Sequence, residues 1–192
     1  MILLFIFKFL KICCYKKIKK YDIITLEMRD LMFEIGDFVV YKRDVCRIKK
    51  FLKNYIKEND YYELVPILDD SLKIVVPVSS HFIRGVLTKE EVDKIIDIIP
   101  YIEVIDVNDK LIESEYKKLL QDGDHIGLIK IIKTTYLRNE DRLNNKKKIS
   151  EKDDNYFNLA ERYLYSEFAV ALDVSFEEAK DYVVESVKEK CN

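Results

Sequence analysis

Alternating apolar and polar residues fill the chain between residues 32 and 87. Residues 32–41 predict a strand, because successive side chains of a strand point to opposite faces. Neither face is purely apolar, as expected of a strongly curved strand in a small barrel. Further strands rich in Val, Ile and Tyr are predicted at residues 45–48, 60–64, 72–78 and 83–86, and their close spacing predicts a barrel or sandwich. One face of the first strand would carry Phe33, Ile35, Asp37, Val39 and Tyr41, and the other Glu34, Phe38 and Val40.

Turn-forming residues separate these strands. Gly36 and Asp37 predict a bulge or a close backbone approach within the first strand. Residues 53–60 predict a hairpin tip with Asn59 and Asp60 as its turn residues, and residues 69–71 predict the next turn. Pro77 predicts a sheet edge or a bulge, because proline cannot donate a ladder hydrogen bond.

After Val86 the apolar period changes from 2 to 3.6 residues, which predicts helices. Thr88 and Glu91 form a capping-box pattern that begins the first helix, and Pro100 ends it. Each helix has one apolar stripe, so the helices are expected to pack together as a bundle over residues 88–191. Further boundaries are predicted at Asn108 (N-cap), Gly123 (C-cap), Asp124 (N-cap), a polar loop over residues 146–154 before the longest helix, and a capping box beginning at Ser175.

Charge is uneven although the formal net charge of the 192-residue chain is only −2. Residues 28–87 are nearly neutral, with ten Lys or Arg and nine Asp or Glu, whereas residues 88–192 carry seventeen and twenty-four, a balance of −7. A nucleic-acid-binding face must therefore be local. The candidate cluster is Lys130, Lys133, Arg138, Arg142, Lys146, Lys147 and Lys148.

No catalytic or metal-binding constellation is visible, so the chain is not expected to be an enzyme or to bind a metal or cofactor. The four Cys residues match no zinc-module spacing. Cys46 alternates within a strand and is expected to be a buried thiol, and this cysteine usage fits a reducing cytoplasm. His81 and His125 have no neighbouring triad or metal partners and are expected to be ordinary surface residues.

Residues 1–27 combine apolar and basic residues without a cap or turn that joins them to the strands. Their apolar run is too short to cross a bilayer and lacks the layout of a signal peptide. They are expected to be a disordered or non-native extension. An alternative is an interfacial anchor formed by residues 1–20.

Two sets of residues resemble the CarD family of bacterial transcription regulators. The first is the strand series that begins with Gly36-Asp37-Phe38-Val39-Val40-Tyr41. The second is the helical half, where Leu119 to Asp124 looks like the family's leucine-rich helix and Gly-Asp turn, and Ala160 to Leu172 looks like its alanine-rich helix. The resemblance covers about residues 32–187. It implies an α+β fold with an N-terminal Tudor/SH3-like barrel over residues 32–87, which interacts with RNA polymerase, followed by a helical domain.

The resemblance also implies a function. The barrel would dock on the RNA polymerase β subunit by sheet-edge pairing and charged contacts, and a monomer would modulate transcription initiation. The chain departs from the family in having no Trp; Asp109 falls near the position of the Trp that the family inserts into the DNA minor groove. Any promoter contact is then expected from the basic cluster, and the alternatives are a polymerase adaptor that does not bind DNA or a small barrel that binds nucleic acid directly. The residues expected to dock on polymerase are Lys53, Lys57, Tyr61, Lys73 and Val75.

Overall fold

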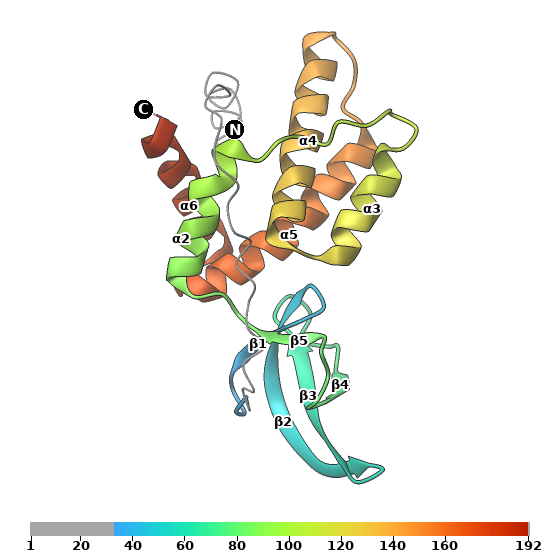
Figure 1. Cartoon of the computed structure of the whole chain (residues 1–192), viewed down its shortest axis with the longest axis vertical. Helices are drawn as coiled ribbons and strands as arrows, with labels where there is room; N and C mark the ends of the chain where they lie inside the picture. Colours follow the sequence, from blue (N-terminus) through green and yellow to red (C-terminus); the bar gives the residue numbers. More distant parts are fainter. Residues whose placement is uncertain (1–32, 192) are drawn as a thin grey trace. The chain divides into compact units, whose positions relative to one another are not determined.

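The computed structural model describes residues 33–191, and the chain divides between Val86 and Leu87 into two compact units. The predicted extension over residues 1–27 lies outside the described residues. The described chain has α+β architecture, with a five-stranded antiparallel sheet followed by five α-helices (Figure 1).

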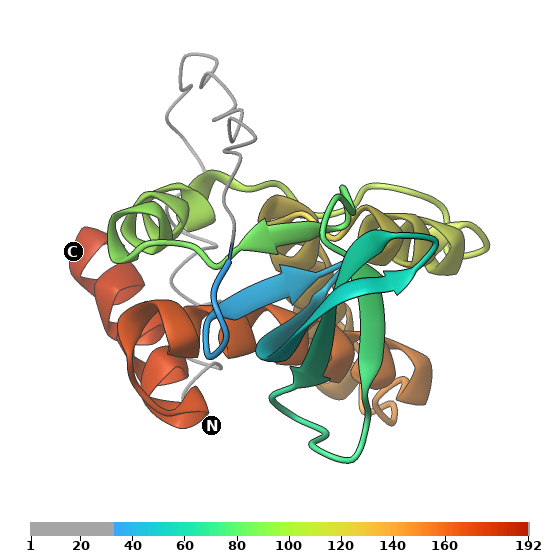
Figure 2. The same ribbon diagram turned by 90° about the horizontal axis from the view of Figure 1, so that it is seen from below.

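The first unit, here the β unit, is a meander whose last strand returns to the first. Its strands lie in the order β4-β3-β2-β1-β5, and every neighbouring pair is antiparallel. The strands twist strongly across one another (Figure 2). β4 and β5 are the two edges, so the sheet is not closed. The strands are β1 (Phe38–Tyr41), β2 (Asp44–Ile56), β3 (Asn59–Pro66), β4 (Ile74–Pro77) and β5 (Ile83–Gly85).

The first strand is shorter than its alternating pattern predicted. Glu34 to Asp37 form a turn in which Gly36 has φ 104°, a conformation that favours glycine. The Gly36 N–H donates to the Ile48 carbonyl at 2.9 Å, which is the predicted close backbone approach. Ile35 is exposed and Asp37 lies in the turn, so these two residues do not share the buried face of Val39.

A small core fills one face of this sheet. Tyr62 is buried in it, and its hydroxyl donates to the Phe33 carbonyl at 3.0 Å. Cys46 is fully buried, as predicted, and burial raises the pKa of its thiol to about 12. The thiol is therefore protonated and unreactive at neutral pH. The core consists of Val39, Cys46, Ile48, Tyr62, Leu64 and Val76.

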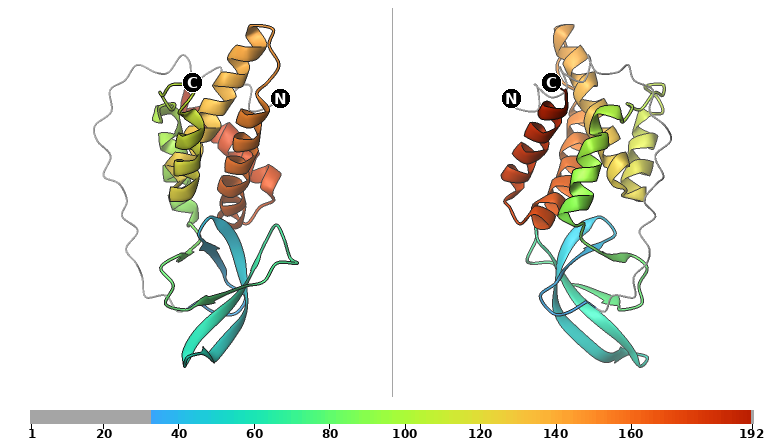
Figure 3. Two further views of the ribbon diagram at one scale, coloured as in Figure 1. Left: turned by 90° about the vertical axis from the view of Figure 1, so that its right-hand side faces the viewer. Right: turned by 60° about the vertical axis from the view of Figure 1, so that its left-hand side comes forward.

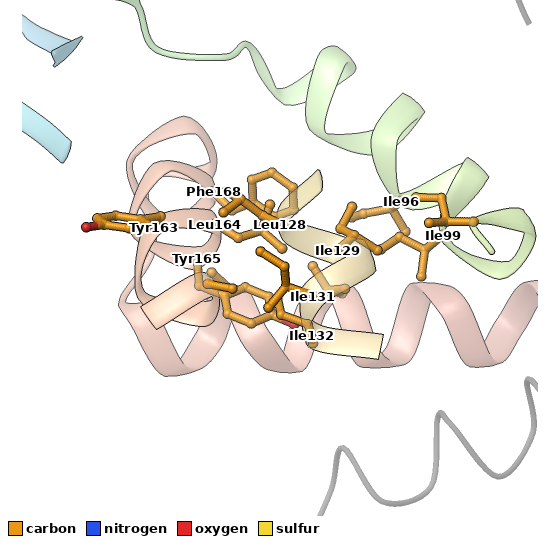
Figure 4. Packing of buried hydrophobic residues seen from close by; sticks show 14 of the residues in the cluster. Ile96, Ile99, Leu128, Ile129, Ile131, Ile132, Tyr163, Leu164, Tyr165 and Phe168 are labelled. Carbon is orange, nitrogen blue, oxygen red and sulfur yellow. The ribbon is translucent and has the colours of Figure 1, made fainter. Parts of the chain in front are cut away.

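The second unit, here the helical unit, packs its apolar stripes into one core. Figure 4 shows Ile96 and Ile99 meeting side chains of the two longest helices. From those helices it labels Leu128, Ile129, Ile131 and Ile132, and Tyr163, Leu164, Tyr165 and Phe168. The elements are α2 (Lys89–Ile98), η1 (Ile99–Tyr101), α3 (Ile112–Asp122), α4 (His125–Asn144), α5 (Glu151–Leu172) and α6 (Phe176–Cys191).

Most of the predicted helix caps are confirmed. Thr88 and Glu91 form a reciprocal capping box at α2, and Ser175 and Glu178 form another at α6. Gly123 ends α3 with φ 68°, and the Asp124 carboxylate accepts a hydrogen bond from the Gly127 N–H at 2.8 Å. These local patterns therefore predicted correctly where α2, α4 and α6 begin and where α3 ends.

Two predicted boundaries are wrong. Asn108 forms a separate turn, with its side chain accepting from the Lys110 N–H, and α3 begins four residues later at Ile112. The predicted loop over residues 146–154 is helical from Glu151, because the Ser150 side chain caps α5 by accepting from the Asp153 N–H.

Three polar contacts hold α6 against the other helices. The Tyr182 hydroxyl donates to Asp93 of α2 at 2.7 Å, and Lys190 pairs with Asp97 of the same helix. Lys180 pairs with the buried Glu161 of α5 at 2.9 Å. The right view of Figure 3 shows α6 lying beside α5. Among helices within residues 33–191, none is long and apolar enough to cross a membrane.

Candidate interaction surfaces

The edge strand β4 brings two of the predicted docking residues together. Tyr61 of β3 pairs with Pro77, and Glu63 pairs with Val75. Paired residues share a face of an antiparallel sheet, and so do residues two apart, so Tyr61 and Val75 lie diagonally on the same face. This face is opposite to the buried Tyr62 and Val76. Lys73 is exposed immediately before β4.

The other two predicted docking residues lie at the far end of the β2–β3 hairpin. β1 pairs with β2 only as far as Arg47, whereas β2 continues to Ile56 (Figure 3, left). Lys53 and Lys57 are exposed in this extension. The hairpin end and the β4 edge thus form one surface of the β unit, here called the edge surface.

The turn of this hairpin differs from the prediction. Ile56 pairs with Asn59, so the turn residues are Lys57 and Glu58, with φ 50° and 61°, and not Asn59 and Asp60. Two successive residues with positive φ define a type I′ turn, which matches the twist of the strands. The Asp60 carboxylate instead accepts the Asn54 N–H at 2.8 Å and supports a bulge in β2.

Sequence reasoning missed three exposed apolar residues on this hairpin. Tyr55 is 56% exposed and packs edge-to-face on Tyr61, with ring centroids 5.8 Å apart. Phe51 and Ile56 are also exposed. These residues lie among four lysines between Lys49 and Lys57, and that composition could have identified the strand as a candidate contact surface. Exposed aromatic and apolar side chains gathered on one hairpin are typical of interaction surfaces.

The predicted DNA-binding cluster is not one continuous surface. Lys133 is buried, and its ammonium group donates to the Ile102 carbonyl at 2.5 Å. Arg138 pairs with Asp109 at 2.7 Å and Asp153 at 3.2 Å, while Arg142 donates to the Lys148 carbonyl at 2.8 Å. These three cations hold parts of the fold in place. Lys146, Lys147 and Lys148 are exposed, and Lys130 is half-buried.

Arg138 is the centre of a charged network that joins α3, α4 and α5. Its partner Asp153 is almost fully buried and also accepts a hydrogen bond from the Tyr116 hydroxyl at 3.3 Å. Burial, reinforced by the Asp153 charge, raises the pKa of Tyr116. Arg138 lowers the pKa of the exposed Asp109 through a hydrogen bond and its charge. Asp109 is therefore an anion neutralised by Arg138.

His125 is not the surface residue that its sequence context predicted. Its Nε2 lies 2.9 Å from a carboxylate oxygen of Glu167, and its side chain is only 14% exposed. The other Glu167 oxygen accepts the Leu87 N–H at 3.2 Å. Glu167 therefore fixes the start of the helical unit onto α5, which is a structural role.

A shallow groove of about 520 Å³ lies between α3 and α5. Glu113 at its side pairs with Lys152 at 2.7 Å and Lys117 at 2.9 Å, and these ammonium groups lower its carboxyl pKa to about 2. The charged groups at the groove thus pair with one another. Within the part of the chain that the structure describes, no three His, Cys, Asp or Glu side chains gather as a metal site.

No protein-family model matches the chain, and no curated protein matches it either.

Proposed function

We propose that this chain is a CarD-like transcription regulator that binds the RNA polymerase β subunit through its β unit. The observation that carries the proposal is the motif series from Gly36 to Val86 together with the β4 edge, which pairs with no further strand within residues 33–191. β5 returns beside β1 in the order β4-β3-β2-β1-β5, which is compatible with a curled Tudor-like barrel. β4 is then available to pair with a polymerase strand.

The composition of the edge surface supports a protein partner. Val75 and Tyr55 are exposed, and Tyr61 lies between them on the hairpin. Partly exposed aromatic residues are typical of protein contact surfaces. Lys53, Lys57 and Lys73 would meet acidic residues of the polymerase and increase the rate of association.

The arrangement of the helical unit favours a role as a polymerase adaptor rather than the insertion of a side chain into the DNA minor groove. Three of the seven predicted DNA-binding cations bond within the fold, and Asp109 is an anion near the position of the family's Trp. We propose that any DNA contact is confined to Lys130 and residues 146–148. Their phosphate contacts would add affinity without sequence readout.

Titration of the purified β subunit with the full chain tests this function. We expect saturable binding that Val75→Glu weakens by about tenfold, because a carboxylate would be desolvated at the sheet edge. Tyr61→Ala should weaken it similarly through lost aromatic burial. Phe82→Ala is the control, since Phe82 is an exposed aromatic residue that precedes the opposite edge strand β5. Absence of binding by the parent chain would refute the proposal.

A further inference from the structure

The segment from Tyr101 to Leu111 is an irregular connection that the helical unit holds rigidly. α4 supplies three anchors along it: Lys133 donates to the Ile102 carbonyl, Thr134 accepts the Ile105 N–H at 2.9 Å, and Arg138 binds Asp109. Ile102 is buried and Ile105 packs on the core. Figure 1 shows this yellow-green connection passing beside α4 before α3 begins. The segment is therefore ordered before any partner binds.

Four large apolar side chains of this segment are exposed. Val104, Val107 and Leu111 are 40%, 38% and 59% exposed, and Tyr101 is 47% exposed. Their exposure to water within eleven residues has a free-energy cost. Exposed apolar side chains on an anchored connection indicate a candidate contact surface.

Backbone hydrogen-bonding groups accompany these side chains. Ile105 donates its N–H inward to Thr134, but the N–H groups of Glu103, Val104, Asp106 and Val107 donate to no residue in 33–191. Ile102, at the beginning of the segment, has extended backbone with φ −70° and ψ 120°. An extended peptide could therefore bond to the segment as an added strand does to a sheet edge.

Charge defines the partner. Glu103 and Asp106 each precede an exposed valine, and neither forms an ion pair with another residue of the described chain. Asp109 adds a third carboxylate, which Arg138 neutralises. Lys110 follows Asp109 as the one cation of the segment, so Glu103 and Asp106 leave a net negative charge. This charge would repel nucleic-acid phosphates and attract lysine or arginine.

We propose that Tyr101–Leu111 is a docking site for an extended, basic and apolar segment of a second protein. The partner's valine-like side chains would cover Val104 and Val107, and its cations would face Glu103 and Asp106. Its backbone would accept hydrogen bonds from the N–H groups that donate to no residue in 33–191. This site is separate from the edge surface, so the chain would connect two proteins.

The test uses the full chain and a synthetic peptide of about ten residues in which lysine and valine alternate. A lysine–serine peptide and a glutamate–valine peptide of the same length are the comparison probes. We expect saturable binding of the lysine–valine peptide only. Equal binding of the lysine–serine peptide would reduce the interaction to charge and overturn the proposal, as would binding of neither.

Variants locate the site. Glu103→Lys with Asp106→Lys, and separately Val104→Ser with Val107→Ser, should each weaken lysine–valine binding by roughly tenfold. Leu143→Ser with Ile149→Ser is the matched control, because these residues are exposed apolar positions elsewhere in the helical unit. Loss of binding in the control alone, or unchanged binding in both site variants, would overturn the proposal.

Amide hydrogen exchange tests the backbone contacts. Exchange at Glu103, Val104, Asp106 or Val107 should slow when the lysine–valine peptide binds, whereas Ile105 should be protected already because it donates to Thr134. A single-stranded oligonucleotide should not protect these amides. Protection by the oligonucleotide, or none by the peptide, would overturn the assignment of a basic protein segment to this site.

Discussion

Buried carboxylates of the helical unit are paired with residues of other helices, as Asp153 is with Arg138 and Glu161 with Lys180, and loss of the partner should lower stability. Arg138 shows this most clearly because it lies between a buried and an exposed carboxylate. From the sequence, Arg138 was predicted to belong to a DNA-binding cluster. The residues near a helical cation do not reveal an ion-pair partner that is distant along the chain. Asp153 becomes its partner only after α4 and α5 pack together.

We predict that Arg138→Met lowers the free energy of unfolding by about 3 kcal/mol, because it leaves Asp153 buried without its cation. Denaturant unfolding measures the loss. Arg142→Met is the control: Arg142 donates to an exposed backbone carbonyl, and its loss should cost under about 1 kcal/mol. The double variant Arg138→Met with Asp153→Asn should recover part of the loss. A loss no larger than that of the control would show that Asp153 does not depend on Arg138.

The buried carboxyl of Glu161 should make the free energy of unfolding depend on pH. Burial raises the pKa of its carboxyl above the ordinary 4.5, and Lys180 offsets this shift only in part. One of its carboxylate oxygens is buried with no hydrogen-bond partner in the described chain. The folded state therefore holds a proton more tightly than the unfolded state. Stability should fall as pH rises from the ordinary value through the raised one.

The variant Glu161→Gln should reduce this fall, and unfolding measured from below pH 4.5 up to neutral pH checks it. Glu178→Gln is a control of opposite sign. The Ser175 N–H and hydroxyl lower the Glu178 pKa, so its contribution is present above 4.5 and is lost as pH falls. Identical pH profiles for Glu161→Gln and the parent would contradict the prediction.

At the scale of elements, local signals predicted the helices better than the strands. The capping boxes at Thr88 and Ser175, and the caps at Gly123 and Asp124, depend on residues at most three positions apart. The start of α5 was missed although Ser150 and Asp153 stand at cap spacing, because the polar residues after Ser150 suggested a loop. The first strand was predicted too long, because the alternation of apolar and polar residues continues through the turn at Glu34 to Asp37.

The β2–β3 hairpin illustrates why strand boundaries are difficult to predict. Asn59 and Asp60 are favourable turn residues, yet the register places Lys57 and Glu58 at the tip. Register depends on pairing along the whole strand and on bulges after Ile48 and Leu52. Local turn preference was therefore outweighed by the pairing of the rest of the hairpin.

We predict that Glu58→Gly raises the free energy of unfolding by about 1 kcal/mol, because glycine adopts positive φ without the steric cost paid by glutamate. Thermal or denaturant unfolding measures the gain. Lys53→Gly is the matched control within the same hairpin, where backbone φ is not positive and glycine should destabilise the strand. A loss of stability from Glu58→Gly would contradict the turn assignment.

At the scale of the whole molecule, the change of apolar period after Val86 correctly predicted an α+β protein. The sequence could not show which charges are exposed to solvent. Lys133 is buried, whereas residues 146–148 are exposed beyond the end of α4. Likewise the sequence suggested Tyr61 and Val75 separately, but only the β3–β4 register places them on one face.

The exposed lysines give a prediction about DNA. Any affinity of the full chain for duplex DNA should fall with salt, with a log–log slope of about −0.9 for each phosphate neutralised. Changing Lys146, Lys147 and Lys148 to Glu should flatten the slope by about 3 if each lysine meets one phosphate. Arg142→Met is the control, because Arg142 is bonded to the backbone. An unchanged slope in the triple variant would exclude residues 146–148 from DNA contact.

The central claim is that the β unit binds the RNA polymerase β subunit at its β4 edge. Hydrogen exchange of the full chain, alone and with saturating polymerase β subunit, tests this claim most directly. We predict slower exchange in β4 and in the hairpin end around Tyr61, with no change in β5. Unchanged exchange throughout the β unit, or protection confined to β5, would contradict the claim.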